Sequence, residues 1–155
     1  MRKYFAMLLA FVVALVGLSA MPVSAAAQDV KTVNGDASVM AEGLIGAYYI
    51  NISNVNGQLC LNGQVRCDNE MASLGFKELK IEQSANGSNW TTYRTLGDIL
   101  TSNDKTCRIE ARKESVQSGY YYRVTCTYYA KEKGLLGILG KTQTEPGVSN
   151  TLRIS

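Results

Sequence analysis

Apolar and polar residues alternate with a period of two along most of the chain beyond residue 43. Seven segments are candidate strands, at 48–55, 58–67, 76–83, 89–96, 106–113, 120–131 and 148–154, and several of them show this pattern. Turn residues separate the segments at intervals of roughly 8 to 14 residues, a rhythm typical of β-sandwiches and barrels. The 3.6-residue periodicity of an amphipathic helix is missing from this part of the sequence. The pattern therefore predicts an all-β domain of seven antiparallel strands.

Two of these segments alternate most clearly. In the first, Cys107, Ile109 and Ala111 alternate with charged residues, which predicts a strand that buries one face. In the second, one face carries Tyr120, Tyr122, Val124, Cys126 and Tyr128. Both strands are therefore expected to contribute to the core.

The N-terminal segment has a different pattern, that of a secretory signal peptide. Arg2 and Lys3 precede an uncharged apolar run over 5–18, and small residues follow over 19–27. A retained membrane anchor is the alternative, but the run is shorter than the roughly 20 residues that span a bilayer. We therefore expect a signal peptide over 1–25, a flexible polar lead-in over 26–43, a β domain over 44–155, and a secreted, extracellular product.

Charge and composition limit the functions that the chain can have. Arg2 and Lys3 belong to the leader, which leaves 14 basic and 13 acidic residues, so the mature chain carries little net charge and no basic stripe for nucleic acid. The chain has no His, which excludes Ser-His-Asp and Cys-His catalysis and imidazole metal ligation. Its carboxylates scatter along predicted strands and turns. We therefore expect no enzyme, no cofactor and no metal site.

Three segments resemble fibronectin type III-like domains. Residues 81–90 resemble the hairpin between the third and fourth strands, with Asn86-Gly87 at the turn. Residues 120–126 resemble the sixth strand, and 145–154 resemble the closing strand. Small exported bacterial proteins of unknown function, built on a similar Ig-like sandwich, share the hairpin and sixth-strand pattern. The resemblance implies a seven-stranded Ig-like β-sandwich and gives no activity, because such sandwiches host many functions.

Four cysteines lie in the predicted mature part, and an even count in an exported chain favours two disulfide bridges over free buried thiols. Their spacing is too wide for a zinc site. If the chain has the sandwich topology that the resemblance implies, Cys67 pairs with Cys107, which leaves Cys60 with Cys126. Cys60 then needs a bulge near Asn62-Gly63 in order to face the same way as the others.

Residues 134–140 form an apolar segment flanked by lysines. The large aliphatic residues of this segment are Leu135, Leu136, Ile138 and Leu139. Loops of a sandwich are usually polar, so these side chains could enter a bilayer or a partner's groove, with the lysines meeting anionic headgroups. Alternatively, the segment folds back over an open end of the sandwich or extends the hairpin.

Aromatic residues are also expected on an outward sheet face. If Tyr122 points inward, Tyr121 and Tyr129 point outward, and Trp90 and Tyr93 lie on the preceding hairpin. Such rings could stack on sugars or anchor a protein contact. The alternative is cross-strand pairing that only stabilises the sheet.

These features lead to three hypotheses of function. The first is an extracellular binding or interaction module for an envelope component, a glycan or a protein. The second is a membrane-active secreted factor, such as a toxin or bacteriocin-like protein, that acts through the apolar loop 134–140. The third, an enzyme, would need a carboxylate pair that the sequence does not display. The oligomeric state stays open, since uncovered sheet edges permit dimers.

Overall fold

The computed structural model describes residues 38–39, 43–134 and 140–155. The predicted leader, most of the lead-in and the aliphatic residues of the apolar loop lie outside these ranges. The described part is antiparallel β-structure without helix, which confirms the all-β prediction, and it contains no helix that could cross a membrane. Its strands are β1 (Ser38–Val39), β2 (Ile45–Val55), β3 (Gln58–Ser84), β4 (Thr91–Thr101), β5 (Asp104–Ser115), β6 (Tyr121–Glu132), β7 (Thr142–Val148) and β8 (Leu152–Arg153).

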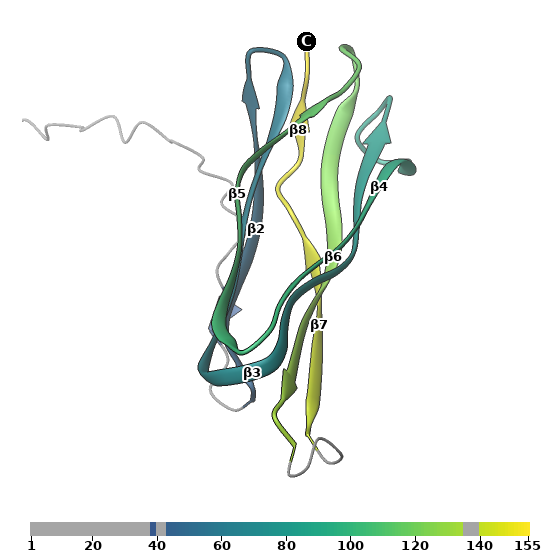
Figure 1. The fold of residues 1–155 in the computed structure, drawn as a ribbon. Coiled ribbons are helices and arrows are strands. Elements are labelled where there is room, and N and C mark those ends of the chain that lie inside the picture. The colour runs from purple at the N-terminus through teal and green to yellow at the C-terminus, as the bar shows by residue number, and fades with distance from the viewer. Residues whose placement is uncertain (1–37, 40–42, 135–139) are drawn as a thin grey trace, which may run out of the picture. The chain divides into compact units, whose positions relative to one another are not determined.

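The long strand β3 organises the fold. Its 27 residues merge two strands that the sequence pattern separates. The first half pairs with β2 and β5, and the second half pairs with β4 and β6 (Figure 1). Register shifts near Met71 and between Phe76 and Leu79 interrupt the ladders where β3 bends. The strands therefore form two sets, β1-β2-β3-β5 on one side of the bend and β4-β3-β6-β7 on the other. The strand β3 belongs to both sets.

A single core cluster draws residues from both sets of strands. The Phe76 ring, on the second half of β3, lies so close to Gly63 on the first half that a Cβ at Gly63 would be 3.0 Å from the ring. Tyr48 of β2 and Tyr128 of β6 have ring centroids 4.4 Å apart. The largest fully buried members are Ile45, Ile50, Leu59, Leu61, Val65, Leu74, Phe76, Leu79, Ile81, Tyr122, Val124 and Ile154. Burial of this apolar surface is the main force that holds the two sets together.

Side-chain amides join the last strands to β2. The Asn150 amide accepts a hydrogen bond from the Ile52 N–H at 2.8 Å and donates one to the Ile52 carbonyl at 2.9 Å. The Gln143 side chain accepts hydrogen bonds from the N–H groups of Leu44 and Ile45. These bonds satisfy backbone groups of β2 and of Leu44, just before it.

Replacement of Asn150 by alanine should therefore weaken the fold. Asn150→Ala leaves the Ile52 N–H and carbonyl without their partner, and Ile52 is only 4% exposed. We expect a loss of about 1–3 kcal/mol in the free energy of unfolding, measured by urea denaturation. The matched control is Thr151→Ala at the exposed neighbouring position, which should change stability by less than about 0.5 kcal/mol. Equal effects of the two variants would contradict the structural role of Asn150.

The predicted alternation of β5 is wrong at one position. Cys107 and Ile109 are buried as predicted, but Ala111 is exposed. Between Ile109 and Arg112, the two β5 residues Glu110 and Ala111 lie opposite the single β3 residue Asn62, and Ala111 has a φ of 46°. The Ala111 N–H donates to the Asn62 side chain at 2.9 Å. This bulge lies on β5, opposite the position near Asn62-Gly63 where the sequence places one.

The four cysteines are free and buried in the structure, so neither predicted disulfide is formed. Val65, not Cys67, lies opposite Cys107 in the β3–β5 register, which displaces the predicted pair by two residues along the strand. Cys60 lies between Leu59 and Leu61 and so points to the other face of β3. The Cys126 sulfur packs against β7, since a Cβ at Gly147 would be 2.7 Å from it. The structure therefore has four free thiols in place of the two expected disulfides.

Burial strongly disfavours ionisation of these thiols. It raises the pKa of Cys126 to about 12. It also raises the pKa of Cys67 to about 11, with a smaller contribution from the neighbouring Asp68 carboxylate, and it raises the pKa of Cys107. These three side chains therefore behave as apolar core residues rather than as nucleophiles.

Candidate functional site

One sheet face presents the side chains that alternate with the buried residues of β6. Along β6, the residues at 122, 124, 126, 128 and 130 are buried and those between them are more exposed. The neighbouring strands continue the same face. We call this surface the outer face, and its residues are Lys77, Lys80, Glu82, Tyr121, Arg123, Thr125, Thr127, Tyr129, Lys131, Thr142, Thr144, Pro146, Val148 and Arg153.

Aromatic rings at this surface carry cations. The Arg123 guanidinium lies 4.4 Å from the centroid of the Trp90 ring. The Lys77 ammonium lies 3.9 Å from the Tyr129 ring, and the Arg153 guanidinium lies 5.6 Å from the Tyr121 ring. Each distance is within the range of a cation–π interaction. The structure thus places Tyr121 and Tyr129 on the outer face, with Trp90 at its border.

The charges of the outer face are unevenly paired. Arg123 Nε donates to Glu82 Oε2 at 2.6 Å, and both side chains are about a quarter exposed. Lys80, Lys131 and Arg153 have no carboxylate within ion-pair distance among the described residues. The Glu82 carboxylate therefore orients Arg123 over Trp90, while the other cations remain available.

Tyr93 lies elsewhere, which corrects its predicted outward position. Ile81 faces Arg94 and Glu82 faces Thr92 in the β3–β4 register, so Tyr93 is the extra residue of a bulge. Its ring turns inward and packs edge-on against the Tyr122 ring, with centroids 5.7 Å apart and planes at 80°. Tyr93 is therefore a core-facing residue.

A small cavity lies at the turn between β3 and β4. Its volume is about 290 Å³, and its lining residues are Gln83, Ser84, Ala85, Asn86, Asn89, Thr91 and Tyr120. The Asn86 side-chain oxygen is already occupied, because it accepts from the N–H groups of Ser88 and Asn89. The buried Gln83 Oε1 has no hydrogen-bond partner within the described structure. This cavity therefore presents amide and hydroxyl groups at the turn that precedes β4.

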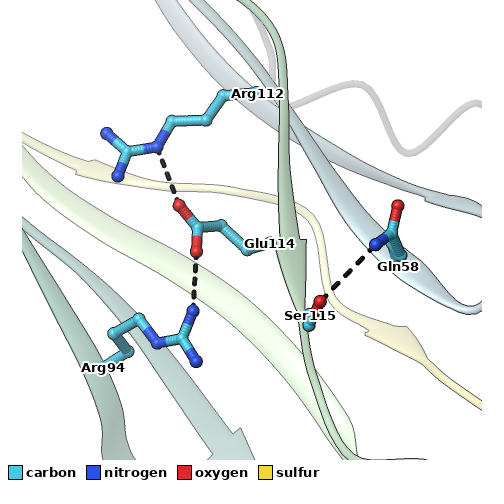
Figure 2. A network of polar contacts seen from close by, with 5 residues as sticks. All are labelled: Gln58, Arg94, Arg112, Glu114 and Ser115. Atoms are coloured by element: carbon cyan, nitrogen blue, oxygen red, sulfur yellow. Dashed lines mark hydrogen bonds and ion pairs between the residues drawn. The ribbon is translucent and has the colours of Figure 1, made fainter.

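The most buried carboxylate of the described ion pairs has a structural role. Glu114 of β5 contacts Arg94 of β4 and Arg112 of its own strand, both at 2.8 Å (Figure 2). The Gln58 side chain donates to Ser115 Oγ nearby at 3.5 Å. Both Glu114 oxygens are occupied by guanidinium groups, so this contact joins the edges of β4 and β5. Arg108 and Glu110 lie 3.8 Å apart as an exposed ion pair, as the charge pattern of this strand suggests.

The apolar loop can be described only at its ends. Leu135, Leu136, Ile138 and Leu139 lie outside the described residues. At the base of the loop, the Glu132 N–H donates to the Lys141 carbonyl at 2.9 Å. Lys133 pairs with Glu70 at 2.8 Å, and this hydrogen bond and charge lower the pKa of the Glu70 carboxyl. One of the flanking lysines is thus already paired with a carboxylate.

Comparison of the chain with protein-family models, with curated proteins and with solved structures found no match. The described residues also contain no group of three or more Cys, Asp or Glu side chains placed to hold a metal ion. The outer face is the candidate functional surface. Sequence reasoning found its tyrosines but missed Lys77, Arg123 and Arg153, although alternation with buried residues marks Arg123 as outward.

Proposed function

We propose that the chain is a secreted, extracellular binding module without catalytic activity, which uses the outer face to hold its ligand. In this proposal the described strands form an Ig-like, fibronectin type III-like β-sandwich. The ligand belongs to the cell envelope or the extracellular space, as an envelope component, a glycan or a protein. The observation that carries the proposal is the set of cation-capped aromatic rings at the outer face.

Several features support the sandwich. The strand orders β1-β2-β3-β5 and β4-β3-β6-β7 correspond to the two sheets of an Ig-like domain, with β3 supplying a strand to each. The contacts of Phe76 with Gly63 and of Tyr48 with Tyr128 join the two sets. The Tyr122 hydroxyl donates to the Gln117 carbonyl at 2.8 Å, five residues upstream, which is the hydrogen bond of a tyrosine corner.

The contacts of the aromatic rings support binding over simple sheet stabilisation. Tyr121 and Tyr129 contact the cross-strand neighbours Arg153 and Lys77, which carry charged groups at the surface, and not other aromatic rings. The ring–ring contacts in the described structure instead involve Tyr48, Phe76, Tyr93, Tyr122 and Tyr128, which are buried or packed against the core. The outer rings hold cations at the surface, where arginine and aromatic residues are frequent in binding sites.

Co-sedimentation with cell envelopes tests this proposal. We expect the purified mature protein to pellet with envelopes, and a Lys80→Glu, Arg153→Glu variant to remain in the supernatant. Lys105→Glu, Lys113→Glu is the control, because it makes the same charge change at exposed positions of β5. Urea denaturation checks that both variants fold.

Three outcomes would count against the proposal. If the wild-type protein stays in the supernatant, it does not bind envelopes. If both variants pellet equally, the outer face is not the binding surface. Pelleting with plain liposomes that is insensitive to the outer-face variant would instead favour the membrane-active alternative and the loop 134–140.

A further inference from the structure

The outer face concentrates positive charge on a chain that is nearly neutral. Its residues include five cations, Lys77, Lys80, Lys131, Arg123 and Arg153, against Glu82 and the exposed Glu78 at the bulge between Lys77 and Lys80. The part of the chain after residue 25 carries 14 basic and 13 acidic residues, so most of the balancing acids lie away from this face. By comparison, the outward residues Arg108 and Glu110 of β5 have opposite charges and form an ion pair. Such segregation attracts an anionic partner to one face.

The cations are distributed along the strands rather than gathered at one point. Lys131 and Arg123 lie eight residues apart on β6, a separation of about 26 Å at the usual rise of a strand. Arg153 lies beside Tyr121 at the end of β6 beyond Arg123, and Lys80 lies opposite Thr125 on β3 between the two ends. A row of this length fits an extended polymer with repeated charges better than a single small anion.

The other outer-face residues are suited to a hydroxyl-rich ligand. The threonines at 125, 127, 142 and 144 follow two paired strands and offer hydroxyl groups that both donate and accept hydrogen bonds. Val148, which is 54% exposed, and Leu100 of the adjacent β4, which is 41% exposed, are the large aliphatic residues on this side of the sheet, so the face offers few apolar side chains for insertion into a bilayer. The Arg153 guanidinium beside the Tyr121 ring pairs a carboxylate-binding group with an apolar platform.

From these features we infer that the outer face binds a linear acidic polysaccharide, one whose sugar units carry carboxylates. This inference rests on the proposed function and names its ligand class. Guanidinium and ammonium groups would neutralise successive carboxylates, threonine hydroxyls would meet the sugar hydroxyls, and the rings of Tyr121 and Tyr129 would support the sugar faces. A polyanion without sugar rings would obtain the charge contacts alone.

The test is affinity gel electrophoresis of the full mature protein in gels that contain polygalacturonate, neutral dextran or poly-glutamate. We expect retardation by polygalacturonate, none by dextran, and at least about tenfold weaker retardation by poly-glutamate, with binding to polygalacturonate falling as salt rises. Lys80→Gln, Arg153→Gln should weaken polygalacturonate binding at least tenfold. The control variant Lys105→Gln, Lys113→Gln should bind as wild type does.

The outcomes separate this inference from the proposed function. Envelope binding that persists without any polygalacturonate binding would overturn the polysaccharide inference and leave the binding module standing. Equal retardation by poly-glutamate and polygalacturonate would overturn the sugar contribution, and stronger binding to vesicles of an anionic phospholipid would assign the face to a membrane. Loss of envelope binding together with polygalacturonate binding would overturn both proposals.

Discussion

In native protein at pH 8, Cys67 and Cys126 should react with iodoacetamide about 100-fold and about 1000-fold more slowly than ordinary thiols, from their pKa values alone. The thiolate is the reactive form, and the ordinary thiol pKa is 9.0. Raising the pKa to about 11 or 12 lowers the thiolate fraction by these factors. Burial adds to the effect, since the two residues are 1% and 7% exposed.

Mass spectrometry of native and urea-unfolded protein, without reductant, measures this difference site by site. Unfolding should make all four cysteines reactive, because none is bonded in the structure. The unfolded protein is thus the internal control for the reagent. Fewer than four labelled sites after unfolding would show a disulfide and revive the bridges expected of an exported chain. Fast labelling of native Cys126 would show instead that the reagent reaches the core beside β7, the strand that pairs with β6 at Cys126.

Gly75→Ala should cost more than about 3 kcal/mol in the free energy of unfolding, which is large for a single methyl group. Gly75 has a φ of 149°, and a Cβ there would collide with the Ile99 carbonyl oxygen and approach the Cys107 sulfur to 3.0 Å. The carbonyl belongs to the backbone of β4, so it cannot move without disturbing the ladder between β3 and β4. Urea denaturation of the purified variant measures the loss.

Gly97→Ala is the matched control for this substitution. Gly97 also has a positive φ, of 80°, but no atom lies within 4 Å of the position that a Cβ would occupy. It should therefore cost only the conformational strain of about 1–2 kcal/mol. A similar loss in both variants would mean that backbone strain, not the contact with β4, restricts position 75.

The alternation of β6 shows what the sequence can predict and what it cannot. It predicts correctly that Tyr122, Val124 and Cys126 are buried, because the direction of a strand side chain follows from the local period of two. The same reasoning fails at Ala111, and Tyr93, expected among the aromatic residues of the binding surface, turns towards the core. Both lie at bulges, and a bulge depends on how two strands pair, which a single strand's pattern does not contain.

The candidate site, too, could be predicted from the sequence only in part. Sequence reasoning named Trp90, Tyr121 and Tyr129, because aromatic residues are visible as residue types and two of them alternate with core positions. It could not name their partners. Lys77 and Arg153 reach the tyrosines from β3 and β8, strands that lie far from them in the sequence, and only the pairing of these strands with β6 brings them together.

By itself, therefore, the sequence determined the β class of this protein, the positions of most strands and the inward residues of β6, since these depend on local periodicity and turn chemistry. The tertiary structure alone decided that β3 runs through both sets of strands, that Val65 rather than Cys67 faces Cys107, and that the cations cover the outer tyrosines. Register and bulges follow from packing between distant segments, and one residue of slip reverses every side chain of a strand.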